Sequence, residues 1–410
     1  NEGMGRTWYS VFSTGSAYGL MIPIGTEMTQ MEHRFVPTRF KDGYGPVGMW
    51  FQYFGAKITN SKGEDYTVTR EAELHKYKPY GLVVPTPTPL RNHQMFLDIK
   101  DGLGPMYMGT DKAMQKIAGD DPEKMRKVKE EAWGDFLDMT ISQALTWASQ
   151  DIRPEVTPSE VVLAEPYIMG SHSGESGAWV SGPEDLAPSD YFWGYNKMTT
   201  IKGLFAAGDG VGAAPHKFSS GSFTEGRLAA KAAVNFLNDN PEDSTLNDGQ
   251  VTSLRDKIWA PLERFEKYKG ASTAEEVNPH YLTPYQGLVR LQKIMDEYAG
   301  GVSAWYTTNK PTLERGIQLI ELLREDLNKL AARDRHELMR CWEVIHRTWV
   351  GESHMRHLLY REETRWPGYY YRSDFPDLDD SKWRVFVNSR FDSETNEWEL
   401  FTKPYINLIE

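Results

Sequence analysis

The stretch GLFAAGDGVGAAPHKFSSGSFTEGRLAAKAAVNF, residues 203–236, decides the fold. Its apolar run at 204–207 predicts a buried parallel strand that ends at Gly208 and Asp209. A small-residue helix follows, and its predicted start carries hydroxyls and a glycine: Ser219, Ser220, Gly221 and Ser222. Because a glycine loop and a helix amino end both present backbone N–H groups, this order predicts a site for an anion or a polar ring edge. An ordinary strand, loop and helix without a ligand is the alternative.

The composition indicates a large acidic protein with more than one core. The chain has 410 residues and a formal net charge of −12, which argues against a nucleic-acid partner, since phosphate backbones are bound by clustered Lys and Arg. No apolar run approaches the roughly 20 residues of a membrane-spanning helix. We therefore expect a cytoplasmic protein without direct membrane insertion.

The count of metal-ligating residues is informative. A single cysteine, Cys341, excludes a cluster ligated by four cysteines of this chain, and its helical context predicts a buried small hydrophobe. His354 and His357 have no supporting ligands in the sequence, and we interpret them as a surface pair on a helix. We therefore predict no metal site in this chain.

Two motifs carry a family resemblance: GDGVGAAPHKFSSGSFTEGR at residues 208–227 and FVPTR at residues 35–39. They resemble the fumarate reductase and succinate dehydrogenase flavoprotein superfamily, and within it the adenylylsulfate reductase alpha-subunit branch. The resemblance covers nearly the whole chain. It implies reductive cleavage of adenylylsulfate to AMP and sulfite, or the reverse oxidation, through a sulfite adduct at N5 of non-covalently bound FAD.

The resemblance also implies a mixed α+β and α/β fold with three domains. Residues 1–31 would be the first segment of a Rossmann-like FAD-binding domain, which we expect to be truncated because no G-x-G-x-x-G motif opens it. Residues 32–160 would form an inserted capping domain, and residues 161–238 the second FAD-binding segment. Residues 250–410 would form a helical domain with a tail of short strands.

Local patterns add two helices to this division. The charged stretch at 122–150 predicts a long helix with a solvated face. Ile317, Ile320, Leu323 and Leu327 recur at helical spacing and predict the buried face of an amphipathic helix.

Three residues are candidates for the sulfur chemistry. Arg39 follows FVPT, and its planar guanidinium can donate two parallel hydrogen bonds to an oxyanion. The resemblance assigns Arg39, His172 and Trp8 to the sulfur-oxyanion pocket. The alternatives are an ion pair at a surface or domain interface for Arg39, a water-bonded loop histidine for His172, and a core tryptophan for Trp8.

The resemblance places Arg91 and Phe223 around the adenine of the nucleotide, with Gln52 nearby. Stacking between a guanidinium plane and an aromatic ring suits any base. The same resemblance assigns FAD binding to the loop and helix start, namely Gly208, Asp209, Ser219, Ser220, Gly221 and Ser222.

One departure from the superfamily weakens the dicarboxylate reading. Fumarate reductases carry a catalytic arginine in the loop before the helix, whereas this loop has His216 and Lys217. A fumarate reductase or succinate dehydrogenase type of oxidoreductase remains the alternative function, and a non-catalytic assembly subunit is a third.

The resemblance further implies a heterodimer with a ferredoxin-like beta subunit that holds the [4Fe–4S] clusters.

Overall fold

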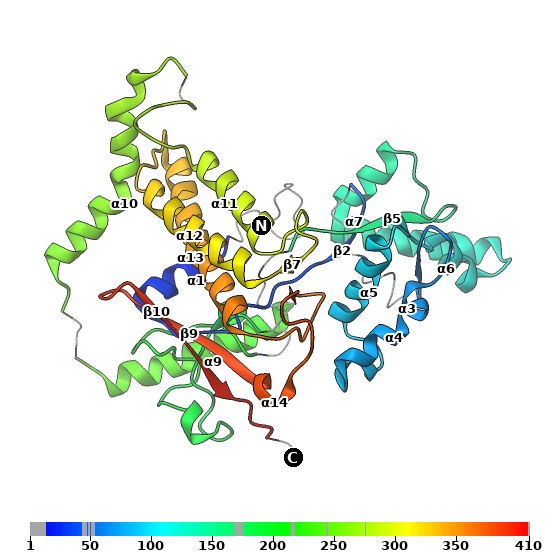
Figure 1. Cartoon of the computed structure of the whole chain (residues 1–410), viewed down its shortest axis with the longest axis horizontal. Coiled ribbons are helices and arrows are strands. Elements are labelled where there is room, and N and C mark those ends of the chain that lie inside the picture. The colour runs from blue at the N-terminus through cyan, green and yellow to red at the C-terminus, as the bar shows by residue number, and fades with distance from the viewer. Residues whose placement is uncertain are drawn as a thin grey trace. The chain divides into compact units, whose positions relative to one another are not determined.

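A computed structural model describes residues 14–42, 47, 50, 54–166, 168, 175–214, 218–242, 245–274 and 276–408, without the side chains of 135–143 and 218. The chain forms two compact units, each described by itself (Figure 1). Unit 1 comprises Asn1–Phe12, Phe35–Tyr167 and Thr364–Tyr371. Unit 2 comprises Ser13–Arg34, Ile168–Glu363 and Arg372–Glu410. The domain division expected from the sequence stays a prediction.

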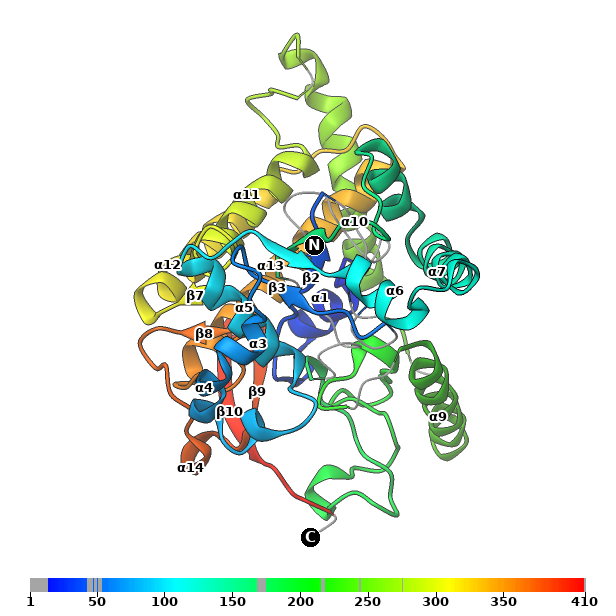
Figure 2. The same ribbon diagram turned by 90° about the vertical axis from the view of Figure 1, so that its right-hand side faces the viewer.

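Unit 1 is built on a four-stranded antiparallel sheet in the order β2-β5-β4-β3. Its strands are β2 (Thr38–Phe40), β3 (Ile58–Thr59), β4 (Met106–Met108) and β5 (Ser159–Leu163). Figure 2 turns this unit toward the viewer. Its helices are α3 (Tyr66–Thr69), α4 (Glu71–Leu74), η2 (His75–Tyr77), η3 (Tyr80–Leu82), α5 (Thr88–Lys100), α6 (Thr110–Ala118) and α7 (Pro122–Ser149).

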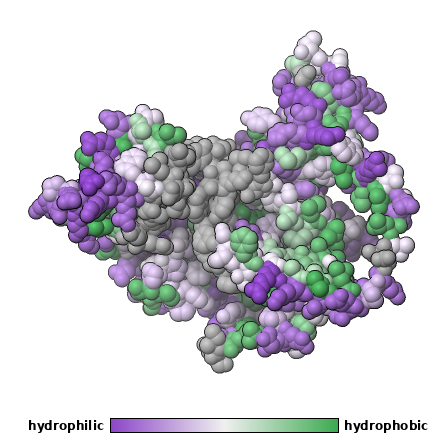
Figure 3. Space-filling model, turned by 180° about the vertical axis from the view of Figure 1, so that it is seen from behind, coloured by the Kyte–Doolittle hydropathy of each residue, from purple (hydrophilic) through white to green (hydrophobic). Residues whose placement is uncertain are grey.

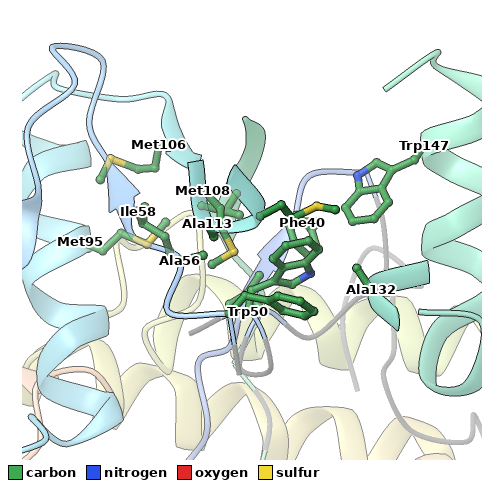
Figure 4. Packing of buried hydrophobic residues seen from close by; sticks show 14 of the residues in the cluster. Phe40, Trp50, Ala56, Ile58, Met95, Met106, Met108, Ala113, Ala132 and Trp147 are labelled. Atoms are coloured by element: carbon green, nitrogen blue, oxygen red, sulfur yellow. The ribbon is translucent and has the colours of Figure 1, made fainter. Parts of the chain in front are cut away.

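One hydrophobic cluster joins the sheet of unit 1 to its helices. Phe40 of β2 meets Trp147 of α7 edge to face, with ring centroids 4.9 Å apart. Met95 of α5 and Met108 of β4 lie in the same cluster and are fully buried (Figure 4). The long helix expected at 122–150 is confirmed, and Asp121 caps it by accepting hydrogen bonds from the backbone N–H groups of residues 123 and 124.

A late segment of the chain, Thr364–Tyr371, completes unit 1. A Cβ on Gly368 would lie 1.9 Å from the carbonyl oxygen of Pro89, so the two backbones touch and only glycine fits there. Tyr369 packs on Phe35 with ring centroids 6.3 Å apart. Residues separated by almost the whole of unit 2 in the sequence therefore share one core.

Unit 2 combines a four-stranded antiparallel sheet, in the order β10-β9-β1-β6, with long helices. The strands are β1 (Met28–Thr29), β6 (Gly177–Ala178), β9 (Val385–Asp392) and β10 (Glu397–Pro404), and the two-stranded sheet of β7 (Thr307–Thr308) and β8 (Tyr371–Arg372) is separate. The helices are α1 (Ser16–Met21), η1 (Ile22–Ile24), η4 (Ser189–Tyr191), η5 (Gly208–Gly210), α9 (Phe218–Asp239), α10 (Asp248–Tyr268), η6 (Lys269–Ala271), α11 (Pro284–Tyr298), α12 (Lys310–Leu327), α13 (Arg335–Tyr360) and α14 (Asp380–Trp383).

The helices of unit 2 pack as the apolar spacing predicted. The stripe that begins at Ile317 forms the buried face of α12, and Ile320 and Leu323 are fully buried. α1 approaches α13 closely, because a Cβ on Gly19 would lie 2.4 Å from Cβ of His346. Cys341 is buried in α13 as expected, and burial raises the pKa of its thiol to about 12.

One face of unit 2 is rich in apolar side chains. Seen from behind, hydrophobic surface gathers there within a hydrophilic border (Figure 3). Ala229 and Ala232 of α9 are buried, but other large apolar side chains of α9 and α10 are exposed: Leu228, Val234, Leu237, Val251, Leu254 and Ile258. Among the described residues α9 is therefore covered on one side only. No described helix combines the length and apolar composition needed to cross a bilayer.

Two local expectations are wrong. Residues 204–207 form no parallel strand: Phe205 makes only an isolated antiparallel bridge to Met198, and the backbone N–H of Ala206 donates to the carbonyl of Lys197. The backbone N–H and C=O groups of this segment form hydrogen bonds with residues 197–199, which lie just before it in the sequence, instead of with a parallel strand. His354 and His357 are buried rather than on the surface, because α13 has neighbours on several sides.

The buried imidazole of His93 makes unit 1 sensitive to acid. His93 stacks between Phe96 and Tyr371, and burial lowers its pKa to about 4 from an ordinary 6.5. Between those values the unfolded chain binds a proton that the folded chain does not, so stability falls as the pH drops. The parent should lose on the order of 2 to 3 kcal/mol more between pH 7 and pH 4 than His93→Phe, measured by urea unfolding.

The control for this prediction is His75→Phe, at an exposed position of the same unit. It should keep the pH dependence of the parent. Equal pH slopes for the parent and His93→Phe would contradict the assignment.

Candidate functional site

The glycine loop and the beginning of α9 lie against each other in unit 2. Gly208 has a φ of 63°, in the left-handed region that favours glycine. A Cβ at this position would lie 3.2 Å from the hydroxyl oxygen of Ser222. The structure therefore brings together two of the residues that the sequence assigned to one site.

The remaining predicted loop residues lie on the same short stretch. Asp209 is exposed in η5, and its carbonyl accepts a hydrogen bond from the hydroxyl of Tyr18. Ser219 and Ser220 are exposed on the first turn of α9, and Gly221 is half-buried. The first turn of a helix carries N–H groups without intrahelical acceptors, so this end of α9 suits a negatively charged or polar group.

Glu225, which the sequence analysis missed, anchors the loop to α9. Its Oε2 accepts a hydrogen bond of 2.9 Å from the backbone N–H of Gly208, and Nζ of Lys197 donates to Oε1 at 3.0 Å. The side chains of Glu225 and Lys197 are only 10% and 16% exposed. The lysine thus neutralises a carboxylate beside the loop. Its position three residues after Ser222, on the same helix face, was the available signal.

β6 runs along the other side of the loop. The N–H of Gly212 donates to the carbonyl of Ala178 at 3.0 Å, and the N–H of Ala213 donates to that of Glu175 at 2.7 Å. A Cβ on Gly177 would lie 2.5 Å from the backbone nitrogen of Gly212, so the close approach requires glycine. Residues 175–178 are therefore fixed to the loop by main-chain bonds.

His33 fixes the same segment from a third direction. Its Nδ1 lies 3.0 Å from Oε2 of Glu175, and its carbonyl accepts a hydrogen bond of 3.0 Å from the hydroxyl of Ser176. Burial opposes a charge on His33, but Glu175 and Glu32 raise its pKa above the ordinary value. The segment that follows residue 174 is thus held by charge as well as by backbone.

Arg39 lies at the centre of β2 in unit 1 and is 2% exposed. It pairs with Val162 of β5. Since side chains alternate along a strand, Arg39 points to the opposite face from Phe40, which belongs to the core. A surface ion pair does not fit this burial.

The segment before Arg39, residues 36–38, is fixed on two sides. The N–H of Ala164 donates to the carbonyl of Pro37 at 2.9 Å. From the other side, Nδ2 of Asn92 donates to the carbonyl of Val36 at 2.6 Å, and the hydroxyl of Thr38 donates to Oδ1 of Asn92 at 2.9 Å. Sequence reasoning missed Asn92, because both of its partners lie more than fifty residues earlier in the chain.

The proposed nucleotide contacts are described separately for each unit. Arg91 is half-buried on the first turn of α5 in unit 1, where its Nη2 donates to the hydroxyl of Thr88 at 3.0 Å. Phe223 is 81% exposed on α9 in unit 2. Five other residues singled out from the sequence lie outside the described residues: Trp8, Gln52, His172, His216 and Lys217.

The part of the chain that the structure describes contains no group of three or more His, Cys, Asp or Glu side chains placed to hold a metal ion. His354 and His357 are instead bonded within the fold. Nδ1 of His354 lies 2.8 Å from the carbonyl of Met31, and Nε2 of His357 lies 2.8 Å from the hydroxyl of Ser389.

Comparison with known proteins gives close matches along the whole chain. Residues 289–407 match the family model for the fumarate reductase flavoprotein C-terminal region. The chain is 49% identical over 418 residues to the adenylylsulfate reductase alpha subunit of Megalodesulfovibrio gigas, which covers 100% of this chain and 63% of that protein. The chain thus spans just under two thirds of the length of this relative.

Solved structures of adenylylsulfate reductases also match this chain. An adenylylsulfate reductase from Archaeoglobus fulgidus matches with a TM-score of 0.97 and 58% identity over 100% of this chain and 64% of its own. A structure of adenosine-5-phosphosulfate reductase with sulfite as a covalent adduct gives the same values. A quinol fumarate reductase from E. coli matches with a TM-score of 0.67 and 15% identity, over 97% of this chain and 63% of its own, which shows a shared fold alone. The expected mixed α and β flavoprotein fold is confirmed.

The contacts of Glu225 predict a large loss of stability on its removal. Glu225→Ala would leave the Lys197 ammonium and the Gly208 N–H without their acceptor in a mostly buried position. We expect the free energy of unfolding to fall by about 2 to 4 kcal/mol in urea titrations. Glu297→Ala is the matched control, since it removes an exposed pair with Lys293 and should cost below about 1 kcal/mol. Equal losses for the two variants would contradict the anchoring role.

Proposed function

Because the chain is homologous to adenylylsulfate reductase alpha subunits along its whole length, we propose that it forms the catalytic flavoprotein part of such an enzyme. The observation that carries the proposal is 58% identity with a TM-score of 0.97 over 100% of the chain. In the proposed reaction the bond between the sulfur and the AMP phosphate oxygen breaks, the sulfur gains two electrons, and AMP and sulfite leave. The reverse direction oxidises sulfite.

The dicarboxylate alternative has weaker support. The likeness to fumarate reductase extends to the fold alone at 15% identity. A shared fold does not fix function, since unrelated activities use the same architecture. Residue 36, where the superfamily motif has the histidine that helps hold a dicarboxylate, is a valine in this chain.

FAD is the proposed cofactor, and the residues around Gly208 fit it. Gly208 has no side chain to block the approach of a flat ring edge, and Ser222 brings a hydroxyl to the same point. N–H groups in the first turn of a helix lack intrahelical acceptors, so the start of α9 suits the electron-rich edge of such a ring. When bound, FAD supplies the exchange of two electrons with the sulfur.

Arg39 is proposed to bind the sulfur oxyanion. Its planar fork can donate two hydrogen bonds to neighbouring oxygens, and its burial removes competing water, which strengthens both bonds. His172 is proposed to donate a hydrogen bond or move a proton near neutrality, and Trp8 to donate its indole N–H while excluding water.

Arg91, Phe223 and Gln52 are proposed to hold the AMP portion. The exposed ring of Phe223 offers a stacking face, and the guanidinium of Arg91 offers a second plane as well as a charge. Each of these two side chains can stack on an adenine without a dedicated hydrogen-bond pattern.

An iron–sulfur beta subunit is the proposed partner. The chain contains one cysteine, and a [4Fe–4S] cluster commonly needs four, so single electrons would reach the flavin from clusters on another chain. The proposed location is the cytoplasm, where adenine nucleotides are available.

The decisive experiment supplies AMP and sulfite to the purified holoenzyme with its partner and follows the reduction of ferricyanide. We expect AMP-dependent sulfite oxidation, flavin and iron in the complex, and no reaction with succinate. Turnover of succinate or fumarate without any reaction of AMP plus sulfite would refute the proposal.

The role of Arg39 predicts a selective loss. Arg39→Ala should abolish sulfite binding and turnover while leaving flavin bound, at a cost of about 3 to 5 kcal/mol in kcat/KM. Arg39→Lys should recover only part, because an ammonium cannot reproduce the two-pronged geometry.

Arg70→Ala is the control for Arg39, since it removes ion pairs to Asp98 and Asp101 in the same unit. It should lower stability without changing sulfite affinity. An Arg39→Ala enzyme that keeps its FAD and turns over within about threefold of the parent would make Arg39 a structural residue.

A further inference from the structure

Asn92 is a buried amide in a helix that carries a proposed substrate contact. It is 5% exposed on α5, between Arg91 and the buried His93. A buried amide costs free energy unless its donor and acceptor are both satisfied. The identity of its partners therefore indicates what the residue does.

Both partners of Asn92 lie in the segment that leads to Arg39. The amide donates to the carbonyl of Val36 and accepts from the hydroxyl of Thr38, so it spans Pro37. Pro37 has no backbone N–H to donate, so the segment has one main-chain hydrogen-bond donor fewer. The amide supplies the bonds that the backbone cannot.

The opposite side of this segment is held by β5 and by the residue that follows it. Ala164 donates to the carbonyl of Pro37, and Thr38 pairs with Leu163 in the sheet. With β5 on one side and Asn92 on the other, the backbone at 36–38 has little freedom. Arg39 is the next residue, so its Cα position follows from these bonds.

The helix that carries Asn92 is also held firmly in unit 1. Leu90 and Met95 of α5 are fully buried, and Met95 belongs to the hydrophobic cluster of unit 1. Arg91 precedes Asn92 directly on the same helix. One side chain thus connects the backbone that bears Arg91 to the backbone that bears Arg39.

We propose that Asn92 is a positioning residue that fixes Arg39 relative to Arg91, so that the oxyanion and nucleotide contacts keep a set spacing. This inference rests on the proposed function. Small displacements of a charged group matter because a hydrogen-bonded clamp is effective only near its productive geometry. Thr38 takes part in the same positioning, because its hydroxyl donates a hydrogen bond to Asn92.

The experiment uses the holoenzyme and measures sulfite affinity from the change in flavin absorbance, AMP affinity by equilibrium binding, and stability in urea. Asn92→Ala should weaken sulfite binding by about tenfold or more, with AMP affinity within about threefold of the parent. Thr38→Val should act in the same direction by removing one of the two bonds. Thr38→Ser keeps the hydroxyl and should restore sulfite affinity.

Asn60→Ala is the matched control. Asn60 is also buried in unit 1, at 2% exposure, and donates to Asp98 and Glu64 rather than to the segment before Arg39. It should lose stability as Asn92→Ala does but keep sulfite affinity.

Two results would overturn the inference. One is equal sulfite affinity in Asn92→Ala and the parent; the other is a loss in Thr38→Ser as large as that in Thr38→Val. If Asn92→Ala does not fold, the Thr38 pair decides. A parent holoenzyme that neither responds to sulfite nor oxidises it with AMP would refute the proposed function and this inference together, whereas an active parent with an unaffected Asn92→Ala variant refutes this inference alone.

Discussion

The ion pair between Glu32 and Arg361 is the constraint on which unit 2 depends. Nε of Arg361 donates to Glu32 at 2.7 Å, while its Nη1 and Nη2 donate to Glu363 at 2.9 Å and to the carbonyl of Val385 at 3.0 Å. Burial alone would raise the pKa of Glu32, but Arg361 and His33 hold it well below its usual range. Because an unpaired buried charge is costly, the segment after β1, the end of α13 and the start of β9 must all be in place together.

The two residues after Glu32 are also buried and have fixed partners. His33 pairs with Glu175, and Arg34 donates hydrogen bonds to the carbonyls of Ala299 and Gly300. Three consecutive buried charges thus anchor three different parts of unit 2. The next segment of the chain belongs to unit 1, and Arg39 lies five residues after Arg34.

The sequence was informative where periodicity is strong and uninformative where bonds join distant residues. Its periodicity predicted α7 and the buried face of α12, and its motifs indicated the flavoprotein fold. It misplaced His354 as a surface residue, because a polar residue on a helix is usually exposed and its neighbours come from other elements. The bond between Asn92 and Val36 joins residues 56 positions apart, which no local pattern reveals. The resemblance assigned Gly208 and Ser222 to one site, and the structure places them together, whereas the roles of Trp8, Gln52 and His172 stay predictions.

The segment Thr364–Tyr371 has a consequence for biosynthesis. Unit 1 needs this segment beside Pro89, yet the ribosome makes it long after Phe35–Tyr167. At ~5 to 20 residues per second, the roughly 200 residues between Tyr167 and Thr364 take about 10 to 40 s to add. During that interval unit 1 exposes apolar surface that the finished protein covers. The ring of Phe35 therefore stays uncovered by Tyr369 until this segment has emerged, and a stall in the helices of unit 2 leaves both units unfinished.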